Sequence, residues 1–205
     1  AMLSKAMEKS GAHRRLALSM VSIYGGDNQR RLVFGFMVAS ALLSMWVSNT
    51  ATTLMLLPVA YAVLDSVSDE DSRKLAVPLF LGIAYAASIG GLGTPIGSPP
   101  NIVFLKIYGE ATGIVPSFSQ WMLWGLPVVL LLLPLAALWI TRHLGATAPV
   151  RIPQAGLWRT EEMRVLVIFS LTALAWITLK EPFGGWTSLL GIPNANYAAV
   201  ALTSV

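Results

Sequence analysis

Five long stretches of this chain contain no aspartate, glutamate, lysine or arginine. They cover residues 32–64, 75–105, 111–141, 165–179 and 182–205. A membrane-spanning helix needs about 20 mainly apolar residues, and several of these stretches are long enough. Charged residues make up 12% of the chain, about half the usual fraction of a soluble domain. The sequence therefore predicts an all-α polytopic membrane protein whose surroundings are a lipid bilayer.

The first charge-free stretch has an unusual length. Its 33 residues would form a straight helix of about 50 Å, whereas the hydrocarbon core of a bilayer is about 30 Å thick. Two full spans would need about 40 residues and a turn. Two half-spans fit, and the polar residues Ser48, Asn49 and Thr50 lie at the centre of the stretch. We predict a re-entrant helical hairpin over residues 32–64 with this polar tip.

Glycine and proline interrupt the second charge-free stretch. Residues 90–100 read GGLGTPIGSPP, in which the glycines permit positive φ and the prolines lack an amide donor. Non-helical backbone at membrane depth persists only where it lines a cavity or is buried in protein, because unpaired amides in lipid are costly. We predict a broken transmembrane helix over residues 75–110 that faces a site, with a simple packing kink as the alternative.

The basic residues indicate which loops share a side. We expect a helical segment over residues 1–31, a transmembrane helix over 117–142, a loop over 143–164 and a further, truncated set of spans over 165–205. We place four parts of the chain on one side: the first segment, the hairpin mouth, and the loops before and after the two following spans. This side then holds 12 of the 14 lysines and arginines. The positive-inside rule then puts this side in the cytoplasm.

Several classes of function find no support in the sequence. No basic stripe with interleaved aromatic residues indicates a nucleic acid partner. The glycine run lacks the lysine of a phosphate-binding loop and the spacing of a dinucleotide fingerprint. The charge-free stretches also contain no His or Cys, so that no acid, base or thiol nucleophile lies within them. We expect a protein that is not an enzyme.

Neutral oxygens at the two breaks suit a cation and an anion together. Ser44 and Ser48 are four residues apart, on one face of the first half-helix, and Asn49 follows at its end. Such oxygens can bind sodium at a broken helix. An anion would be attracted to the N-termini of the half-helices that begin near Thr50 and Asn101. Serine and threonine in membrane helices also bond to their own backbone, which is the structural alternative.

Four stretches of sequence resemble the divalent anion:sodium symporter family. They are SMWVSNTATTLMLLP and GIAYAASIGGLGTPIGSPPN at the two breaks, and EKSGAHRRLAL and GDNQRRLVFGFM before them. The resemblance implies sodium-coupled transport of dicarboxylates, citrate or sulfate by an inverted-repeat protein with a scaffold domain and a mobile transport domain, working as an elevator. It also implies a homodimer. We expect an integral protein of the bacterial inner (plasma) membrane.

The resemblance also implies roles for particular residues. The Ser-Asn-Thr tip would bind both a sodium ion and a substrate carboxylate, and the broken helix would close the ion site. We assign sodium to Ser44, Ser48, Asn49 and Gly93, and substrate to Asn49, Thr50, Thr94, Ser98 and Asn101. Residues 165–205 would begin the second repeat, whose own site the chain lacks, so these residues alone are expected to transport nothing.

Two other functions stay open. An exchanger or another ion transporter with the same broken-helix plan would not depend on sodium. A structural membrane module would bind no ligand, and a change of Asn49 would then alter folding alone. Three properties stay open: which anion is carried, how many sodium ions accompany it, and whether the protein works by symport or by exchange.

Overall fold

The computed structural model describes residues 11, 15–16, 18–19, 21, 28–145, 159–179 and 185–189. All regular structure in these residues is helical, without a strand, which confirms the predicted all-α fold class. The helices, in chain order, are α3 (Gln29–Ser44), α4 (Asn49–Leu64), α5 (Asp69–Gly90), the 3₁₀ turn η1 (Gly91–Gly93), α6 (Pro99–Thr112), α7 (Phe118–Thr141), α8 (Thr160–Ile177) and α9 (Gly185–Leu189).

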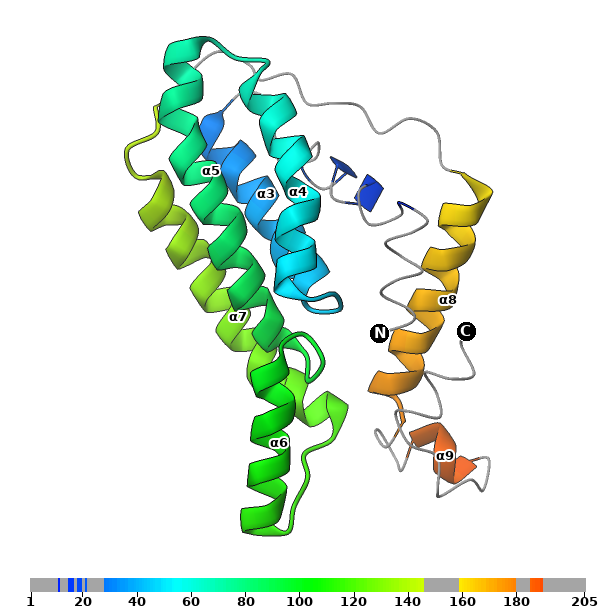
Figure 1. The fold of residues 1–205 in the computed structure, drawn as a ribbon. Helices are drawn as coiled ribbons and strands as arrows, with labels where there is room; N and C mark the ends of the chain where they lie inside the picture. Colours follow the sequence, from blue (N-terminus) through cyan, green and yellow to red (C-terminus); the bar gives the residue numbers. More distant parts are fainter. Residues whose placement is uncertain are drawn as a thin grey trace.

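Helices α3 and α4 form a hairpin of two short arms that lie side by side (Figure 1). Each arm has 16 residues, or about 24 Å, which is less than the roughly 30 Å of a hydrocarbon core. At the turn, Ser48 caps α4 by accepting a hydrogen bond from the amide of Ala51 at 3.3 Å. The structure thus has two short helices joined at the Ser-Asn-Thr tip, and their re-entrant placement in a bilayer stays a prediction.

The glycine-proline segment separates two helices. Helix α5 has 22 residues and passes into η1, after which the backbone is not helical until Pro99. Helix α6 then continues to Thr112, beyond the short apolar stretch that the sequence indicates, and Gly113 ends it with a φ of 73°. Charged residues are accommodated on α6 because Lys106 and Glu110 lie at its exposed surface, 4.0 Å apart.

The core of the bundle is the contact between α3 and α5. Side chains from α3 such as Phe36 and Met37 are fully buried. The hydroxyl of Ser40 donates to the carbonyl of Ile83 across 2.8 Å. A Cβ atom on Gly90 would lie 2.2 Å from the carbonyl oxygen of Ala41, so the two backbones touch where only glycine fits. Small residues allow this close approach of helices in membrane proteins.

Within the residues that the structure describes, two helical segments are long and apolar enough to cross a membrane by length and composition. They are residues Asp69–Gly93 and Phe118–Thr141. In the apolar 18-residue window of each segment, 44% of the first and only 17% of the second are buried in the protein. Helix α7 therefore presents most of its apolar side chains outward, as a lipid-facing helix does, and Leu130 and Leu138 are about 70% exposed.

The hairpin mouth and the end of α7 lie at the same end of the bundle. Arg30, in the first turn of α3, donates from Nε to the carbonyl of Leu144 at 2.6 Å and from Nη2 to the carbonyl of Arg142 at 3.2 Å. The sequence predicts that both segments lie on one side, in the cytoplasm, and that placement stays a prediction.

Helix α8 begins earlier than expected, at Thr160, inside the predicted loop 143–164. Its start is capped by Glu162, whose carboxylate accepts from the amide of Arg159 at 2.8 Å and pairs with Arg15 at 2.8 Å. Most of the predicted segments 1–31 and 165–205, and residues 146–158 of the loop, lie outside the described residues.

Candidate ion and solute site

The hairpin tip and the helix break are in contact. The hydroxyl of Thr94, in the break, donates to the backbone carbonyl of Met45, in the tip. A Cβ on Gly93 would lie 2.7 Å from the end of the Met45 side chain, and one on Gly91 would lie 2.8 Å from Oδ1 of Asn49. In Figure 1 the turn between α3 and α4 accordingly lies beside the loop between α5 and α6.

Two side-chain oxygens converge at the tip. The hydroxyl of Ser44, which is fully buried, donates to Oδ1 of Asn49 across 2.5 Å. Asn49 itself is half-buried because it is the first residue of α4. Both oxygens carry further lone pairs. If the Ser44 proton turns away, the pair presents two oxygens to a cation at the point where they now bond to each other.

The irregular backbone of the break is held by side chains from its surroundings. Asn101 donates from Nδ2 to the carbonyls of Gly91 at 2.8 Å and Thr94 at 2.9 Å. Trp121 of α7 donates from its indole nitrogen to the carbonyl of Leu92 at 2.9 Å. These bonds satisfy groups that a helix would otherwise pair, which is the condition for a break at membrane depth.

The two helix N-termini at the site differ in their donors. The first amides of any helix lack partners within the helix and attract anions. Helix α4 begins with Asn49 and Thr50, which both have amide hydrogens. Helix α6 begins with Pro99 and Pro100, which have none. The N-terminus of α4 is therefore the better hydrogen-bond donor to a carboxylate.

The structure brings most of the predicted site residues together. Gly91 lies between Asn49 and Ser98, since its Cβ would also meet the Cβ of Ser98 at 3.4 Å. Ser98 precedes α6, but its side chain makes no capping hydrogen bond to the helix. Of the remaining predicted residues, Ser44, Gly93, Thr94 and Asn101 are buried, whereas Ser48 and Thr50 are exposed at the tip.

Thr94 and Asn101 already have structural partners. The Thr94 hydroxyl joins the break to the tip, and both amide hydrogens of Asn101 go to backbone carbonyls. Each side chain can still accept a hydrogen bond. Their assignment to substrate stays a prediction, and their present contacts shape the break.

Sequence reasoning missed three residues of the site. Met45 supplies the carbonyl that Thr94 bonds and the side chain that covers Gly93. Gly91 leaves room for the Asn49 side chain. Thr52 is fully buried, and among the described residues its hydroxyl has no hydrogen-bond partner. The glycine run and the threonines after the tip were visible in the sequence, but which of them face the tip depends on how the helices cross.

Trp46 packs on the side of the tip that faces α7 and α8. Its ring stacks on Phe118 at 6.1 Å and meets Phe169 edge-on at 5.4 Å. Phe118 also contacts Trp176 of α8 at 6.0 Å. These contacts give Trp46 aromatic neighbours on α7 and α8.

Charged side chains are absent from the set of residues that forms the site. Within the residues that the structure describes, no group of three or more His, Cys, Asp or Glu residues is placed to hold a metal ion. An ion bound at the tip would therefore be held by hydroxyl, amide and carbonyl oxygens. Such ligands suit a hard monovalent cation at an unwound helix.

The regular structure of the described residues is helical and largely apolar. A helical hairpin and an interrupted helix present neutral oxygens to each other there, which is the design of a polytopic membrane protein with discontinuous helices. A model of the citrate transporter family matches residues 1–204. The chain belongs to this family and is an integral membrane protein. The resemblance to sodium symporters of divalent anions is thereby confirmed at the level of the family.

Sodium-dependent dicarboxylate transporters of two staphylococci are similar to the chain. The protein of Staphylococcus saprophyticus is 35% identical over 204 residues, which are 90% of this chain and 39% of that protein. The protein of Staphylococcus aureus strain USA300 is 35% identical over 215 residues, 96% of this chain and 41% of that protein. The chain thus spans about two fifths of the length of these relatives.

Proposed function

We propose that the protein to which this chain belongs is a secondary carrier that couples sodium to the uptake of small carboxylates. The observation that carries the proposal is the contact between the Ser-Asn-Thr tip and the glycine break, which the Thr94 hydroxyl makes with the carbonyl of Met45. Within the tip itself, oxygens of Ser44 and Asn49 lie 2.5 Å apart. The family is described as citrate transporters and the relatives as sodium-dependent dicarboxylate transporters. Dicarboxylates and citrate are the substrates we favour, with sulfate as a further candidate from the resemblance.

In this proposal sodium binds at the tip. Its ligands are the side-chain oxygens of Ser44, Ser48 and Asn49 together with the backbone carbonyl of Gly93. The Ser48 hydroxyl already accepts from the Ala51 amide, and its second lone pair can meet the ion. The Ser44 proton turns away from Asn49 when the ion enters, so the short bond between them is replaced by two contacts with the cation.

A carboxylate of the substrate then binds at the N-terminus of α4. Asn49 and Thr50 supply amide hydrogens there, and Ser98 supplies a hydroxyl from the facing break. Thr94 and Asn101 complete the substrate side in our assignment. The positive end of the helix and the sodium ion attract the anion, so that no arginine or lysine is needed.

Sharing Asn49 between the two ligands gives a physical basis for coupling. The ion fixes the Asn49 side chain and adds positive charge beside the anion site. Each ligand therefore raises the affinity of the other, and the effect is reciprocal by thermodynamic linkage. A transport cycle that binds both together follows from this contact.

Further assignments rest on the resemblance and on the organisms of the relatives. We propose a homodimer with inverted repeats and an elevator-type movement, located in a bacterial plasma membrane. Residues 32–64 are its re-entrant hairpin, residues 75–110 its broken helix and residues 117–142 a full span. Catalysis of a chemical reaction plays no part in this function.

The test is uptake of succinate and of citrate by the whole protein in proteoliposomes, with and without an inward sodium gradient. We expect uptake that requires sodium and that Asn49→Ala abolishes. Asn28→Ala is the matched control, because Asn28 caps α3 by accepting from the amide of Arg30 at 2.9 Å, away from the tip. It should reduce stability by about 1 kcal/mol and leave the sodium dependence unchanged.

Other results would point elsewhere. Uptake that ignores sodium would favour an exchanger of the same plan. Well-folded protein that takes up no dicarboxylate, citrate or sulfate would favour a structural module, as would an Asn49→Ala variant that unfolds in proportion to its loss of uptake.

A further inference from the structure

An apolar groove runs along the outer side of the bundle between α5 and α7. It has a volume of about 590 Å³. Its walls are mainly aliphatic and aromatic, and most of its wall side chains are exposed, including Val77 at 63% and Trp139 at 69%. Its wall includes Val77, Leu81, Tyr85, Trp139, Arg142 and His143.

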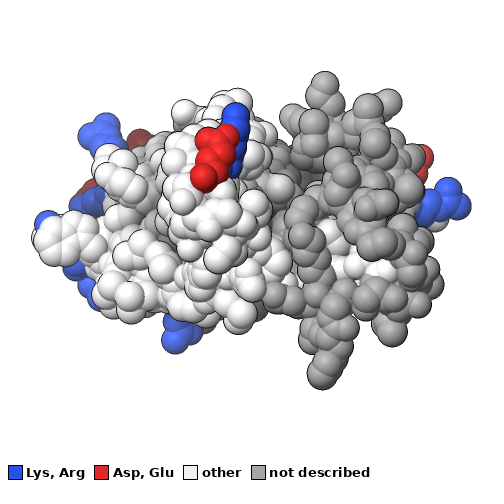
Figure 2. Space-filling view, turned by 90° about the horizontal axis from the view of Figure 1, so that it is seen from below, with Lys and Arg blue, Asp and Glu red and all other residues white. Residues whose placement is uncertain are grey.

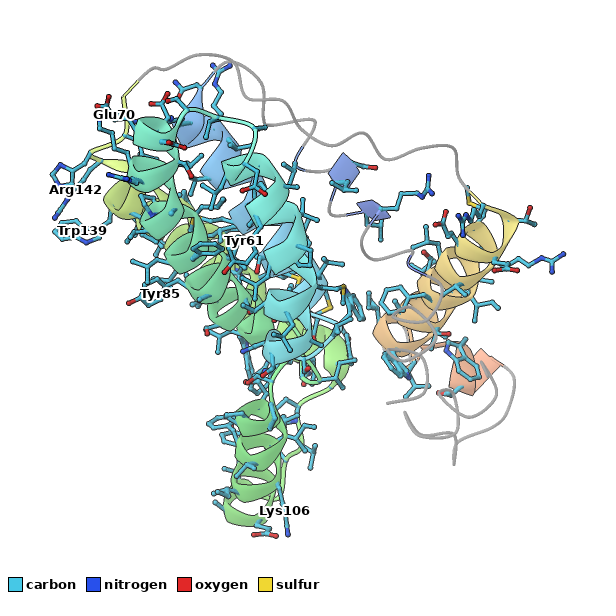
Figure 3. All side chains as sticks on the ribbon, turned by 45° about the horizontal axis from the view of Figure 1, so that its top comes forward. Tyr61, Glu70, Tyr85, Lys106, Trp139 and Arg142 are labelled. Carbon is cyan, nitrogen blue, oxygen red and sulfur yellow. The ribbon has the colours of Figure 1, made fainter. Side chains whose placement is uncertain are left out.

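One end of the groove is polar and basic. The guanidinium carbon of Arg142 lies over the ring of Trp139, 3.9 Å from its centroid. Nε of Arg142 donates to Nε2 of His143 at 2.9 Å. Figure 3 shows Trp139 and Arg142 together on the flank of the bundle, with Tyr85 farther along the same flank.

The contact with Trp139 prepares Arg142 to bind an oxyanion. A guanidinium held over an aromatic ring is attracted to the face of the ring and keeps N–H groups that can still donate to an oxyanion. Trp139 and His143 hold it in place, so that little side-chain entropy is lost when a phosphate binds. Arg30 adds a second positive charge nearby, since it bonds the backbone carbonyl of Arg142 at 3.2 Å.

The position of this end fits a membrane surface. It lies with the hairpin mouth at the end of the bundle that the basic residues assign to the cytoplasm. From Val77 to Tyr85 the apolar wall extends about 12 Å along α5, toward the middle of the predicted span. Seen from below in Figure 2, most of the described surface is uncharged, with one acidic and basic group well inside it and the other charged side chains toward its edge.

We propose that this groove binds an anionic phospholipid of the cytoplasmic leaflet. One acyl chain lies against Val77, Leu81 and Tyr85, and the phosphate accepts hydrogen bonds from Arg142 above Trp139. The charge complementarity selects an anionic lipid, because the basic end attracts its headgroup while the walls exclude water. A free phosphate would contact only the basic end of the groove and would leave the apolar walls uncovered. The proposal concerns a face of the protein remote from the tip and is independent of the transported substrate.

The experiment counts lipids that remain on the whole protein. The protein is reconstituted in nanodiscs of phosphatidylcholine with one tenth phosphatidylglycerol, released gently, and examined by native mass spectrometry. We expect a bound phosphatidylglycerol, and a loss of about fivefold in its retention for Arg142→Gln, as one interfacial arginine contributes. Arg73→Gln is the matched control: Arg73 is an exposed arginine of α5 that does not line the groove, and it should retain the lipid.

A second variant tests the apolar wall with every charge kept. Val77→Trp fills the groove from an exposed position, and we expect it to release phosphatidylglycerol as strongly as Arg142→Gln. Equal retention in wild type, Arg142→Gln and Val77→Trp would overturn the proposal. So would displacement of the lipid by inorganic phosphate or glycerol phosphate alone, because the acyl chain would then contribute nothing.

Discussion

The hydroxyl of Ser44 donates a hydrogen bond to Oδ1 of Asn49 across 2.5 Å, and it thereby joins the last residue of α3 to the first residue of α4. This bond closes the hairpin at its tip. It also places two oxygens at one point without any charged side chain, which is the arrangement that the proposed sodium site needs.

Removing one of these two oxygens should weaken sodium binding. Contacts of a polar group with a charge contribute about 1.5–3 kcal/mol, so Ser44→Ala should lower sodium affinity tenfold or more. The affinity is read from the sodium dependence of the unfolding temperature of the whole protein.

Ser40→Ala is the control one turn earlier on α3. Ser40 is equally buried, but it bonds the carbonyl of Ile83 at 2.8 Å. We expect it to reduce stability by about 1 kcal/mol without a change in sodium affinity. A parallel loss of sodium affinity in both variants would contradict the assignment of Ser44 to the ion.

Alanine substitutions of two neighbouring glycines at the break should have different effects, one on ligand affinity and the other on stability. A Cβ at Gly91 would lie 2.8 Å from Oδ1 of Asn49, the movable end of a side chain. Gly91→Ala should therefore fold and yet bind sodium and succinate less tightly, because it displaces Asn49. Isothermal titration of the whole protein measures this effect.

A Cβ at Gly90 would lie 2.2 Å from the carbonyl oxygen of Ala41, which is backbone and cannot move away without separating α3 from α5. Gly90→Ala should therefore reduce stability by about 1–3 kcal/mol or more, as overpacked cores do. The prediction for the pair fails if Gly91→Ala proves the less stable variant and keeps full ligand affinity.

The buried hydroxyl of Thr52 should lower the stability of the wild-type protein relative to a variant without it. An unpaired buried polar group destabilises a protein by about 1–3 kcal/mol, and valine has the same shape without the hydroxyl. Without sodium and substrate, Thr52→Val should raise the unfolding temperature. Thr53→Val should lower it, because the Thr53 hydroxyl bonds the carbonyl of Asn49 at 2.8 Å. A lower unfolding temperature for Thr52→Val would show that the hydroxyl has a partner in the folded protein.

The carboxylate of Glu162, which precedes the predicted span of α8, should add a pH dependence. The hydrogen bond from the amide of Arg159 lowers its pKa from the usual value of 4.5, and the charges of Arg15 and Arg159 act in the same direction. Because the folded-state pKa is the lower one, the stabilisation is complete above the unfolded-state pKa and is lost as the pH falls through the folded-state value.

Unfolding temperatures measured from pH 6 down to pH 3 test this dependence. Glu162→Gln should flatten the decline relative to wild type, whereas Glu161→Gln, at an exposed position beside it, should follow the wild type. A Glu162→Gln curve with the wild-type slope would show that the cap does not titrate in this range.

Much of the local structure could be predicted from residue types. The apolar stretch around Ser48, Asn49 and Thr50 is the wrong length for full spans, and the structure has two short helices there. The run of glycines and prolines predicted a break, and the backbone leaves the helix between Gly93 and Pro99. The end of α6 differs from the prediction: the helix extends to Thr112, because no residue interrupts it before Gly113.

The sequence by itself determined the lipid surroundings, the class of fold and the two places where helices break. These depend on hydropathy and on the backbone chemistry of glycine and proline. Only the tertiary structure decided that Gly91 faces Asn49, that Thr94 bonds Met45 and that the Thr52 hydroxyl finds no partner in the described part of the chain. These pairs are separated by dozens of residues or depend on the rotation of a helix about its axis. They form because α3 and α5 approach until Gly90 touches the backbone of Ala41, and that approach brings the tip against the break.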